Sequence, residues 1–492
     1  MAIILTILNK YKGLPIQVKA SVWALICGVL NKGISVLTTP IFTRLLSTSE
    51  YGEYNVFSSW LTILSIIVSF NLSAGVYAQG LVKFEEKKKE FASSMQGLSL
   101  VMVAAWSLVY ILFKDFWNSV FGLSTVQMLS MLLMIWLGAV VNFWVYEQKN
   151  ENKYKALVLV TVGVAVISPA LSIFLIQHRE DKVTARILGT LIVEAVFYVW
   201  LFVIQLKNGK KFFEGKLWKY ALMFNLPLVP HYLSQVVLAS SDRIMIERMV
   251  GKSEAGIYSL AYSVSMVMLI VNNALMQTLS PWIYRKIKAK ENREIAPIAY
   301  STLIGIAVIN IILIAFAPEA VKIFAPAEYY AAIRIIPPVA ISVFYIYSYD
   351  LFAKFAFYYE KQGYITVASI IGALLNIILN YIFINKFGYI AAGYTTLACY
   401  MIYALCHYII MNRVCDKFCG GVRPYNGKII LLISAAFTAL GLLMLLTYNS
   451  VIIRYSIIGV IAVACLVFSK KIIAFFKNIL SLKKPDNKGE MG

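Results

Sequence analysis

The 492-residue sequence is poor in charge, histidine and cysteine. Charged residues make up 14% of the chain, whereas a soluble globular domain carries about 25%. His178, His231 and His407 are far apart in the sequence, and Cys415 and Cys419 have no second pair nearby, so no metal site is predicted. The phosphate-binding pattern G-x-x-x-x-G-K-[ST] is missing, which argues against an ATP-driven pump.

Apolar residues are abundant instead. They make up 60% of the chain, the mean hydropathy is +0.75, and they fall in blocks of about 20, the length that crosses a bilayer. The sequence therefore predicts an all-α polytopic membrane protein with about 14 transmembrane helices. The predicted spans are 20–43, 54–77, 92–113, 122–146, 155–177, 184–206, 219–248, 257–283, 296–317, 332–358, 363–384, 389–411, 428–447 and 451–469.

Lysine and arginine are distributed unevenly among the predicted loops. With both termini in the cytoplasm, 31 basic residues lie on the cytoplasmic side and 12 on the opposite side, as the positive-inside rule requires. The net charge of +21 is then mostly loop charge that meets anionic lipid head groups, so nucleic acid is not predicted as a partner. The N-terminal residues do not predict a cleavable signal peptide, and we expect the first span to act as the insertion signal.

One short pattern occurs twice. R-x4-S-E-x-G-x-Y begins at Arg44 and again at Arg248, 204 residues later, and six predicted spans begin between residues 20 and 206. An even number of crossings restores the orientation, so two pseudo-symmetric six-helix lobes around a cavity are predicted, related by an axis along the membrane normal. We expect an N-lobe at 1–206, a cytoplasmic linker at 207–218, a C-lobe at 219–412, and two added helices with a basic cytoplasmic tail at 413–492.

The repeated pattern has two interpretations. Ser49 and Ser253 are expected to cap the helices that follow, and Arg44 and Arg248 end the preceding spans at the predicted outer interface. One interpretation is a structural helix corner with snorkelling arginines. The other is an outer mouth at which both arginines help to bind or release an anion.

Charged and polar residues inside the spans are candidates for function, because burying charge in a membrane is costly. Lys32 lies in the middle of the first span and is expected to attract an anionic head group, with a structural snorkelling lysine as the alternative. His231, Asp242 and Arg243 lie in the seventh span, which also contains two prolines. Adjacent residues point about 100° apart on a helix, so Asp242 and Arg243 are expected to pair with other helices.

Other intramembrane charges are candidates for ion coupling. Glu194, in the sixth span, is expected either to hydrogen-bond a neighbouring helix or to take up a proton or cation. Asp350 and Lys354 are four residues apart in the tenth span, which favours an ion pair along one helix face or a coupling site. A coupling ion, H⁺ or Na⁺, is therefore the expected ligand besides the substrate, and no other cofactor is predicted.

Several segments together resemble a known family. They are 21–27, 32–35, 38–46 with 50–52, 80–84 with 93–98, 225–231 and 241–243. In these segments the chain resembles the Wzx-type bacterial polysaccharide flippases of the multidrug/oligosaccharidyl-lipid/polysaccharide exporter (MOP) superfamily. The resemblance is strong from residue 20 to about residue 290 and weaker beyond.

The resemblance implies that the protein moves undecaprenyl-pyrophosphate-linked oligosaccharide repeat units from the cytoplasmic to the periplasmic leaflet of the bacterial inner membrane. The repeat units would serve O-antigen (lipopolysaccharide), capsule or exopolysaccharide synthesis, and the expected mechanism is alternating access. Pyrophosphate carries about two negative charges, so a cationic path lowers its barrier in a low-dielectric core. The positions assigned to this path or its gate are Lys32, Arg44, Asp242, Arg243 and Arg248.

The resemblance also implies partners and leaves alternatives. The expected partners are the lipid-linked oligosaccharide and membrane lipids, with a polysaccharide polymerase and a chain-length regulator as further candidates. One alternative, a multidrug and toxin extrusion cation exporter, often needs a carboxylate in the first helix, whereas this first span offers Lys32. The other, a lipid-linked sugar polymerase, would need a large outward loop, and the predicted outward loops are short. The chain is therefore not expected to be an enzyme.

Overall fold

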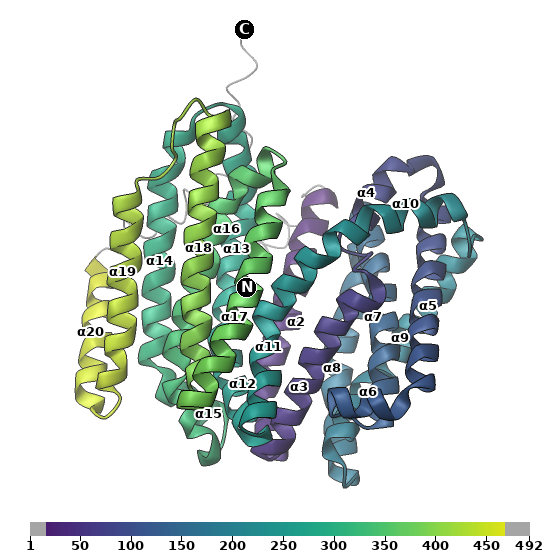
Figure 1. Ribbon diagram of the computed structural model, residues 1–492, viewed down its shortest axis with the longest axis horizontal. Helices are drawn as coiled ribbons and strands as arrows, with labels where there is room; N and C mark the ends of the chain where they lie inside the picture. Colours follow the sequence, from purple (N-terminus) through teal and green to yellow (C-terminus); the bar gives the residue numbers. More distant parts are fainter. Residues whose placement is uncertain (1–15, 468–492) are drawn as a thin grey trace, which may run out of the picture. The chain divides into compact units, whose positions relative to one another are not determined.

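The computed structural model describes residues 16–467, and all regular secondary structure in that range is helical (Figure 1). The chain forms two compact units, residues 1–247 and 248–492, which are described separately below. Unit 1 contains α2 (Ile16–Leu45), α3 (Thr48–Ser69), α4 (Val76–Lys83), η1 (Glu85–Lys87), α5 (Lys88–Leu112), α6 (Lys114–Phe121), α7 (Thr125–Asn150), α8 (Tyr154–His178), α9 (Lys182–Gly209), α10 (Gly215–Asn225), η2 (Leu226–Leu228) and most of α11 (Val229–Met249). Unit 2 contains α12 (Lys252–Met266), α13 (Met268–Lys288), η3 (Asn292–Glu294), α14 (Ile295–Ala315), α15 (Ala317–Phe324), η4 (Ala327–Arg334), α16 (Ile336–Tyr358), α17 (Gln362–Phe387), α18 (Ala391–Phe418), α19 (Gly427–Leu443), η5 (Met444–Thr447) and α20 (Val451–Val467).

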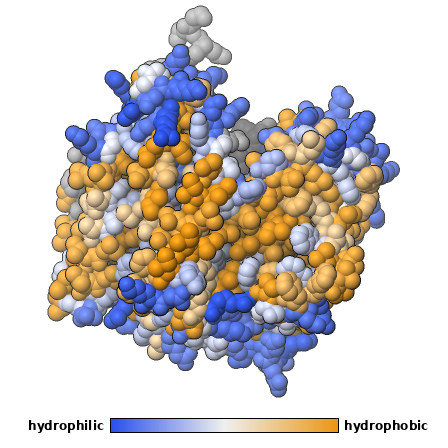
Figure 2. Space-filling view, viewed as in Figure 1, coloured by the Kyte–Doolittle hydropathy of each residue, from blue (hydrophilic) through white to orange (hydrophobic). Residues whose placement is uncertain are grey.

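The helices confirm the predicted all-α polytopic membrane protein. Twelve helices of the described range are long and apolar enough to cross a bilayer. The two other predicted spans correspond to α3, which has 22 residues, and to α20, which contains a shorter apolar stretch at Val451–Val463. The face in Figure 2 shows a broad apolar band with hydrophilic side chains gathered at the helix ends.

Both units repeat one order of helices. α3 begins at Thr48 and α12 at Lys252, which are 204 residues apart. The short helices α6 and α15 each follow a long span, and their first residues, Lys114 and Ala317, are 203 apart. Further along, α8 and α9 recur as α17 and α18. The repeat that was visible in one short pattern therefore extends from α3–α9 to α12–α18.

The boundary between the two compact units follows Glu247, and α10 packs against α4 and α5 of unit 1. The Trp218 indole N–H donates a hydrogen bond to the Ser94 carbonyl at 3.0 Å and helps to hold α10 there. The linker at 207–218 stays a prediction, as does the assignment of residues 219–412 to one lobe.

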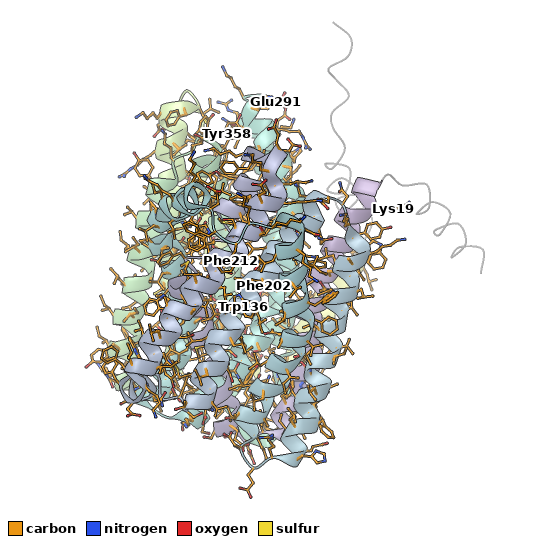
Figure 3. The ribbon with its side chains drawn as sticks, turned by 90° about the vertical axis from the view of Figure 1, so that its right-hand side faces the viewer. Lys19, Trp136, Phe202, Phe212, Glu291 and Tyr358 are labelled. Atoms are coloured by element: carbon orange, nitrogen blue, oxygen red, sulfur yellow. The ribbon has the colours of Figure 1, made fainter. Side chains whose placement is uncertain are left out.

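Each unit has one central helix. In unit 1 this is α7, whose Trp136 meets Phe202 of α9 with ring centroids 5.0 Å apart (Figure 3). In unit 2 it is α16, which is buried along most of its length and packs against α18, α14, α12 and α13. The added helices α19 and α20 pack on α14, and Arg454 of α20 donates two hydrogen bonds to Glu319 of α15, at 3.0 and 2.6 Å.

Candidate functional site

α2 carries two of the predicted site residues. The backbone of Lys32 lies within this helix, but its side chain lies outside the described residues, so its role stays a prediction. Arg44 lies in the exposed last turn, and its Nη1 donates to the Pro40 carbonyl at 2.7 Å. The Arg44 side chain thus runs back along its own helix.

The predicted seventh span is a bent helix, formed by α10, η2 and α11. Pro227 lies at the start of η2 and has no N–H for a helical hydrogen bond. Just before it, Asn225 is fully buried; its Nδ2 donates to the Phe70 carbonyl at 2.7 Å, and its Oδ1 accepts from the Val76 N–H at 3.0 Å. A Cβ at Gly75 would lie 2.6 Å from that Oδ1. Asn225 therefore clamps the bend to the corner between α3 and α4.

α11 positions the other predicted residues of this span. His231 and Asp242 are 11 residues apart, close to three helical turns, so they lie on one face of α11 about 16 Å apart. Asp242 is buried, and Arg243 is half-buried and donates from Nη1 to the Ala239 carbonyl at 3.3 Å. The half-buried His231 has a buried Nδ1 without a hydrogen-bond partner among the described residues. Arg248, in the last turn, is exposed.

The two copies of the repeated pattern start their helices differently. Ser47 caps α3: the Glu50 N–H donates to its Oγ at 3.2 Å, and its own N–H donates to Glu50 Oε2 at 2.7 Å. The predicted cap at Ser49 is wrong, because the helix already begins at Thr48. In the second copy Gly251 precedes α12 and makes no side-chain cap.

Three aromatic rings surround the guanidinium of Arg186 of α9 and form an aromatic cage. Two of them belong to the first copy of the repeated pattern, and the cage was not predicted from the sequence. The guanidinium carbon lies 3.5 Å from the Tyr54 ring centroid and 3.8 Å from the Phe42 centroid, with Tyr51 at 5.7 Å. A planar guanidinium stacks well on aromatic faces. The sequence feature that could have indicated this cage is the pair of tyrosines, Tyr51 and Tyr54, in the first copy of the repeated pattern. In unit 2 the fifth residue of the corresponding helix α18 is Thr395 rather than an arginine.

Further contacts join the first copy to α7 and α9. Gln127 Nε2 donates to Glu53 Oε1 at 3.3 Å and to Thr184 Oγ1 at 3.2 Å. Lys182 Nζ lies 3.9 Å from Glu50 Oε2. These contacts hold the first copy against α7 and α9, and both interpretations of the repeated pattern stay predictions. The gating role of Arg44 and Arg248 stays a prediction.

The candidate coupling residues have different surroundings. Glu194 is half-buried on α9, and its carboxylate makes no hydrogen bond or ion pair with another described residue. The predicted interhelical hydrogen bond is thus not found within the described range. Asp350 and Lys354 do pair along α16, at 2.7 Å. The coupling roles of these three residues stay predictions, and no cluster of three or more His, Cys, Asp or Glu side chains that could hold a metal occurs among residues 16–467.

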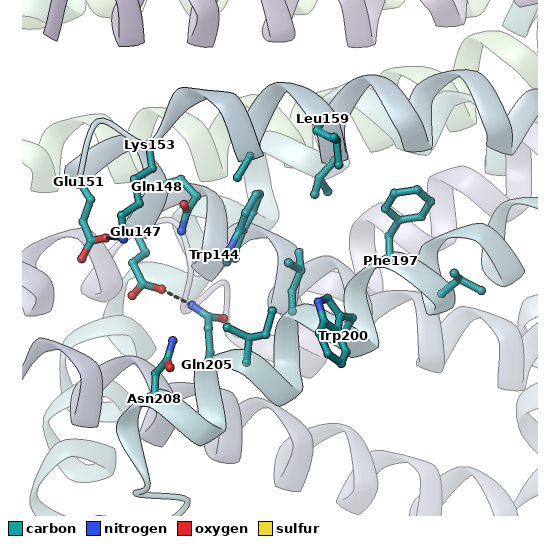
Figure 4. Close-up of a pocket in the computed structure, with 15 residues that line it drawn as sticks. Trp144, Glu147, Gln148, Glu151, Lys153, Leu159, Phe197, Trp200, Gln205 and Asn208 are labelled. Atoms are coloured by element: carbon teal, nitrogen blue, oxygen red, sulfur yellow. Dashed lines mark hydrogen bonds and ion pairs between the residues drawn. The ribbon is translucent and has the colours of Figure 1, made fainter. Parts of the chain in front are cut away.

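A cavity of about 550 Å³ between α7, α8 and α9 was not predicted (Figure 4). Its polar end contains Glu147 and Gln205, and Gln205 Nε2 donates to Glu147 Oε2 at 2.7 Å. Gln205 Oε1 in turn accepts from Gln96 Nε2 of α5. Residues from three helices meet here over separations of up to 109 positions, which no local pattern reveals.

The family of the chain follows from its sequence. The chain belongs to the family described as "Polysaccharide biosynthesis protein", whose model matches residues 18–287, more than half of the chain. A protein of the Lsg locus of Haemophilus influenzae is 21% identical over 379 residues, covering 73% of this chain and 88% of that protein.

Solved structures share the fold. The lipid II flippase MurJ, in an inward closed conformation, has a TM-score of 0.65 and 16% identity, covering 92% of this chain and 100% of that one. An inward-facing multidrug resistance MATE family transporter of the MOP superfamily has a TM-score of 0.58 and 12% identity, covering 78% and 95%. The match confirms the predicted membership of a polysaccharide biosynthesis family, and the solved structures that share the fold are of flippases and transporters.

Proposed function

We propose that this protein moves lipid-linked oligosaccharide repeat units, carried on undecaprenyl pyrophosphate, from the inner to the outer leaflet of a bacterial cytoplasmic membrane. The family description supports a role in polysaccharide biosynthesis, and the fold is one found in a lipid flippase. Alternating access of the two repeats is the proposed mechanism. The uneven distribution of basic residues supports an orientation with both termini in the cytoplasm.

One observation supports an anionic substrate most directly. Lys32 and Arg243 lie on α2 and α11, the helices that precede the two copies of the repeated pattern. Equivalent helices of a duplicated transporter are suited to line one path. A path with lysine and arginine lowers the barrier for pyrophosphate and raises it for organic cations.

The same observation disfavours cation export. α2 contains no Asp or Glu between Ile16 and Leu45, whereas the cation-exporter alternative often needs a carboxylate in the first helix. For energy coupling we propose H⁺ or Na⁺, with Glu194 and the Asp350–Lys354 pair as candidate sites. A polymerase and a chain-length regulator are the proposed protein partners.

Transport of a defined glycolipid tests this function. The full-length protein is reconstituted in vesicles, and the transfer of a short fluorescent glycan on isoprenoid pyrophosphate between leaflets is measured. Arg243→Ala should slow transfer about 10- to 100-fold, because a hydrogen bond to a charged group contributes about 1.5–3 kcal/mol. Arg179→Ala, an exposed arginine after α8, is the matched control and should leave the rate unchanged. Export of an organic cation without any glycolipid transfer would contradict the proposal.

A further inference from the structure

The cavity of unit 1 is amphipathic. It lies between α7, α8 and α9, at the end of these helices where the α7–α8 loop runs (Figure 4). One end is lined by polar side chains from α7, α9 and the loop, and the other end by apolar and aromatic side chains from α8 and α9. A ligand that fills about 550 Å³ here must carry a polar group at one end and a hydrocarbon part at the other.

Glu147 makes no direct ion pair with a described residue at the polar end, where the ammonium of Lys153 pairs with Glu151 instead. The hydrogen-bond partner of Glu147 is the Gln205 amide at 2.7 Å, and no Lys, Arg or His of the described chain lies within 4.0 Å of its carboxylate. Glu151, one turn further, differs, because Lys153 and Lys88 pair with it at 2.6 and 3.1 Å. A partly buried carboxylate without a direct ion-pair partner can accept hydrogen bonds from a further positively charged group.

Two amides beside Glu147 also lack partners. Gln148 is only 8% exposed, yet its side chain makes no hydrogen bond with any described residue, and in Figure 4 it lines the cavity. Asn208, at the end of α9, is exposed at the cavity and makes no side-chain hydrogen bond with a described residue. Glu147, Gln148 and Asn208 thus offer three acceptor groups, the number that matches the three N–H donors of a primary ammonium.

The apolar end opens at the exposed surface of α8 and α9. Trp200 is 63% exposed, and Leu159 and Val196 are also exposed, although all three lie within membrane-spanning helices. Exposed apolar side chains at membrane depth contact acyl chains. The cavity therefore continues from a polar, acceptor-rich end to exposed apolar side chains that are suited to contact hydrocarbon chains.

We propose that this cavity binds an aminophospholipid of the surrounding leaflet, with its primary ammonium on Glu147, Gln148 and Asn208 and an acyl chain along Trp200. The exposed Lys153 at the rim suits the phosphate of such a head group. A choline head group has no N–H to donate to these acceptors, so it fits less well. This site is separate from the proposed transport function, and lipid binding is measured without any transport assay.

The test compares lipids on the purified full-length protein. After delipidation in detergent, bound phosphatidylethanolamine, phosphatidylcholine and phosphatidylglycerol are counted by native mass spectrometry. The wild-type protein should retain phosphatidylethanolamine about tenfold better than phosphatidylcholine, a difference of about 1.4 kcal/mol. Glu147→Gln keeps the acceptor for Gln205 but removes the charge, and should abolish this preference. Glu86→Gln, an exposed carboxylate at the same end of unit 1, is the matched control and should retain it.

A second variant separates a lipid site from a cation site. Trp200→Ala leaves the polar end intact and should weaken retention of every lipid at this site, with an unchanged melting temperature showing that the fold is kept. Equal retention of phosphatidylethanolamine and phosphatidylcholine by the wild type would overturn the proposal. So would stabilisation by Na⁺ alone that depends on Glu147 and is indifferent to Trp200, because that result would assign the acceptors to a metal cation.

Discussion

Replacing Glu319 by alanine should destabilise unit 2 more than replacing its partner Arg454. The two residues join α15 to α20 through two hydrogen bonds, at 3.0 and 2.6 Å, and the Tyr455 hydroxyl donates a third to Glu319 Oε1 at 3.2 Å. The pair is uneven in exposure, since Arg454 is 3% exposed and the Glu319 side chain 29%. The loss in the free energy of unfolding therefore depends on which of the two charged side chains remains without its partner.

The magnitudes follow from that difference. Glu319→Ala leaves a buried guanidinium without its carboxylate, which costs about 3–5 kcal/mol for a buried pair. Arg454→Ala leaves a carboxylate that water can reach, and its hydrogen bond from Tyr455 stays, so we expect about 1–2 kcal/mol. The double variant Glu319→Leu/Arg454→Met replaces the pair by apolar side chains and should be close to the wild type.

Two measurements check this order. Thermal melting of the purified protein reports the overall loss, and hydrogen exchange of the α19 and α20 amides reports whether the loss is local to these added helices. Glu328→Ala, an exposed carboxylate in η4, is the matched control and should change neither. Equal losses for Glu319→Ala and Arg454→Ala, or a double variant less stable than both, would refute the reasoning.

Three further predictions concern unit 1. Asn225→Ala leaves two buried backbone groups of the α3–α4 corner unsatisfied and should cost about 2–5 kcal/mol in chemical denaturation, whereas an unchanged midpoint would show that the clamp is dispensable. Arg186→Lys removes the planar stacking in the aromatic cage and should cost about 1–2 kcal/mol, which melting against Arg179→Lys checks. The Lys153 ammonium, with Lys88, lowers the pKa of the Glu151 carboxyl in the folded protein. These ion pairs therefore stabilise the fold above the pKa of an unfolded glutamate, about 4.3, and the stabilisation is lost as the pH falls through the lower pKa of the folded state. Melting from pH 7 to pH 3 should show that loss, and Lys153→Ala should reduce it; identical pH profiles would exclude the effect.

The positions of helix ends were predicted less accurately from the sequence than the presence of the helices. The second span was predicted at 54–77, whereas α3 runs from Thr48 to Ser69. Hydropathy missed its polar first turn, which the Ser47 capping box holds in helical form. At the other end, Phe70 and Asn71 take left-handed backbone conformations that stop the helix before the apolar residues run out. An apolar block locates a span, while local hydrogen bonds and backbone conformation decide where the helix begins and ends.

The predicted pairing of Asp350 and Lys354 succeeded because both residues lie on one helix, four positions apart. The cavity between α7, α8 and α9 could not be predicted from such a local spacing. Glu147 and Gln205 are 58 residues apart, and neither belongs to a pattern that distinguishes it from other polar residues near a loop. Packing of α7 on α9 is what brings them together.

The sequence by itself determined the class, the number of spans, the internal repeat and the family. A bilayer crossing requires about 20 consecutive apolar residues, so each span can be recognised from its own stretch of sequence. Only the tertiary structure decided that Asn225 clamps the corner at residues 70–76, that Arg186 lies between Phe42 and Tyr54, and that a cavity opens between α7, α8 and α9. These features join residues up to 155 positions apart, and such contacts depend on how helices pack rather than on the period of any one helix.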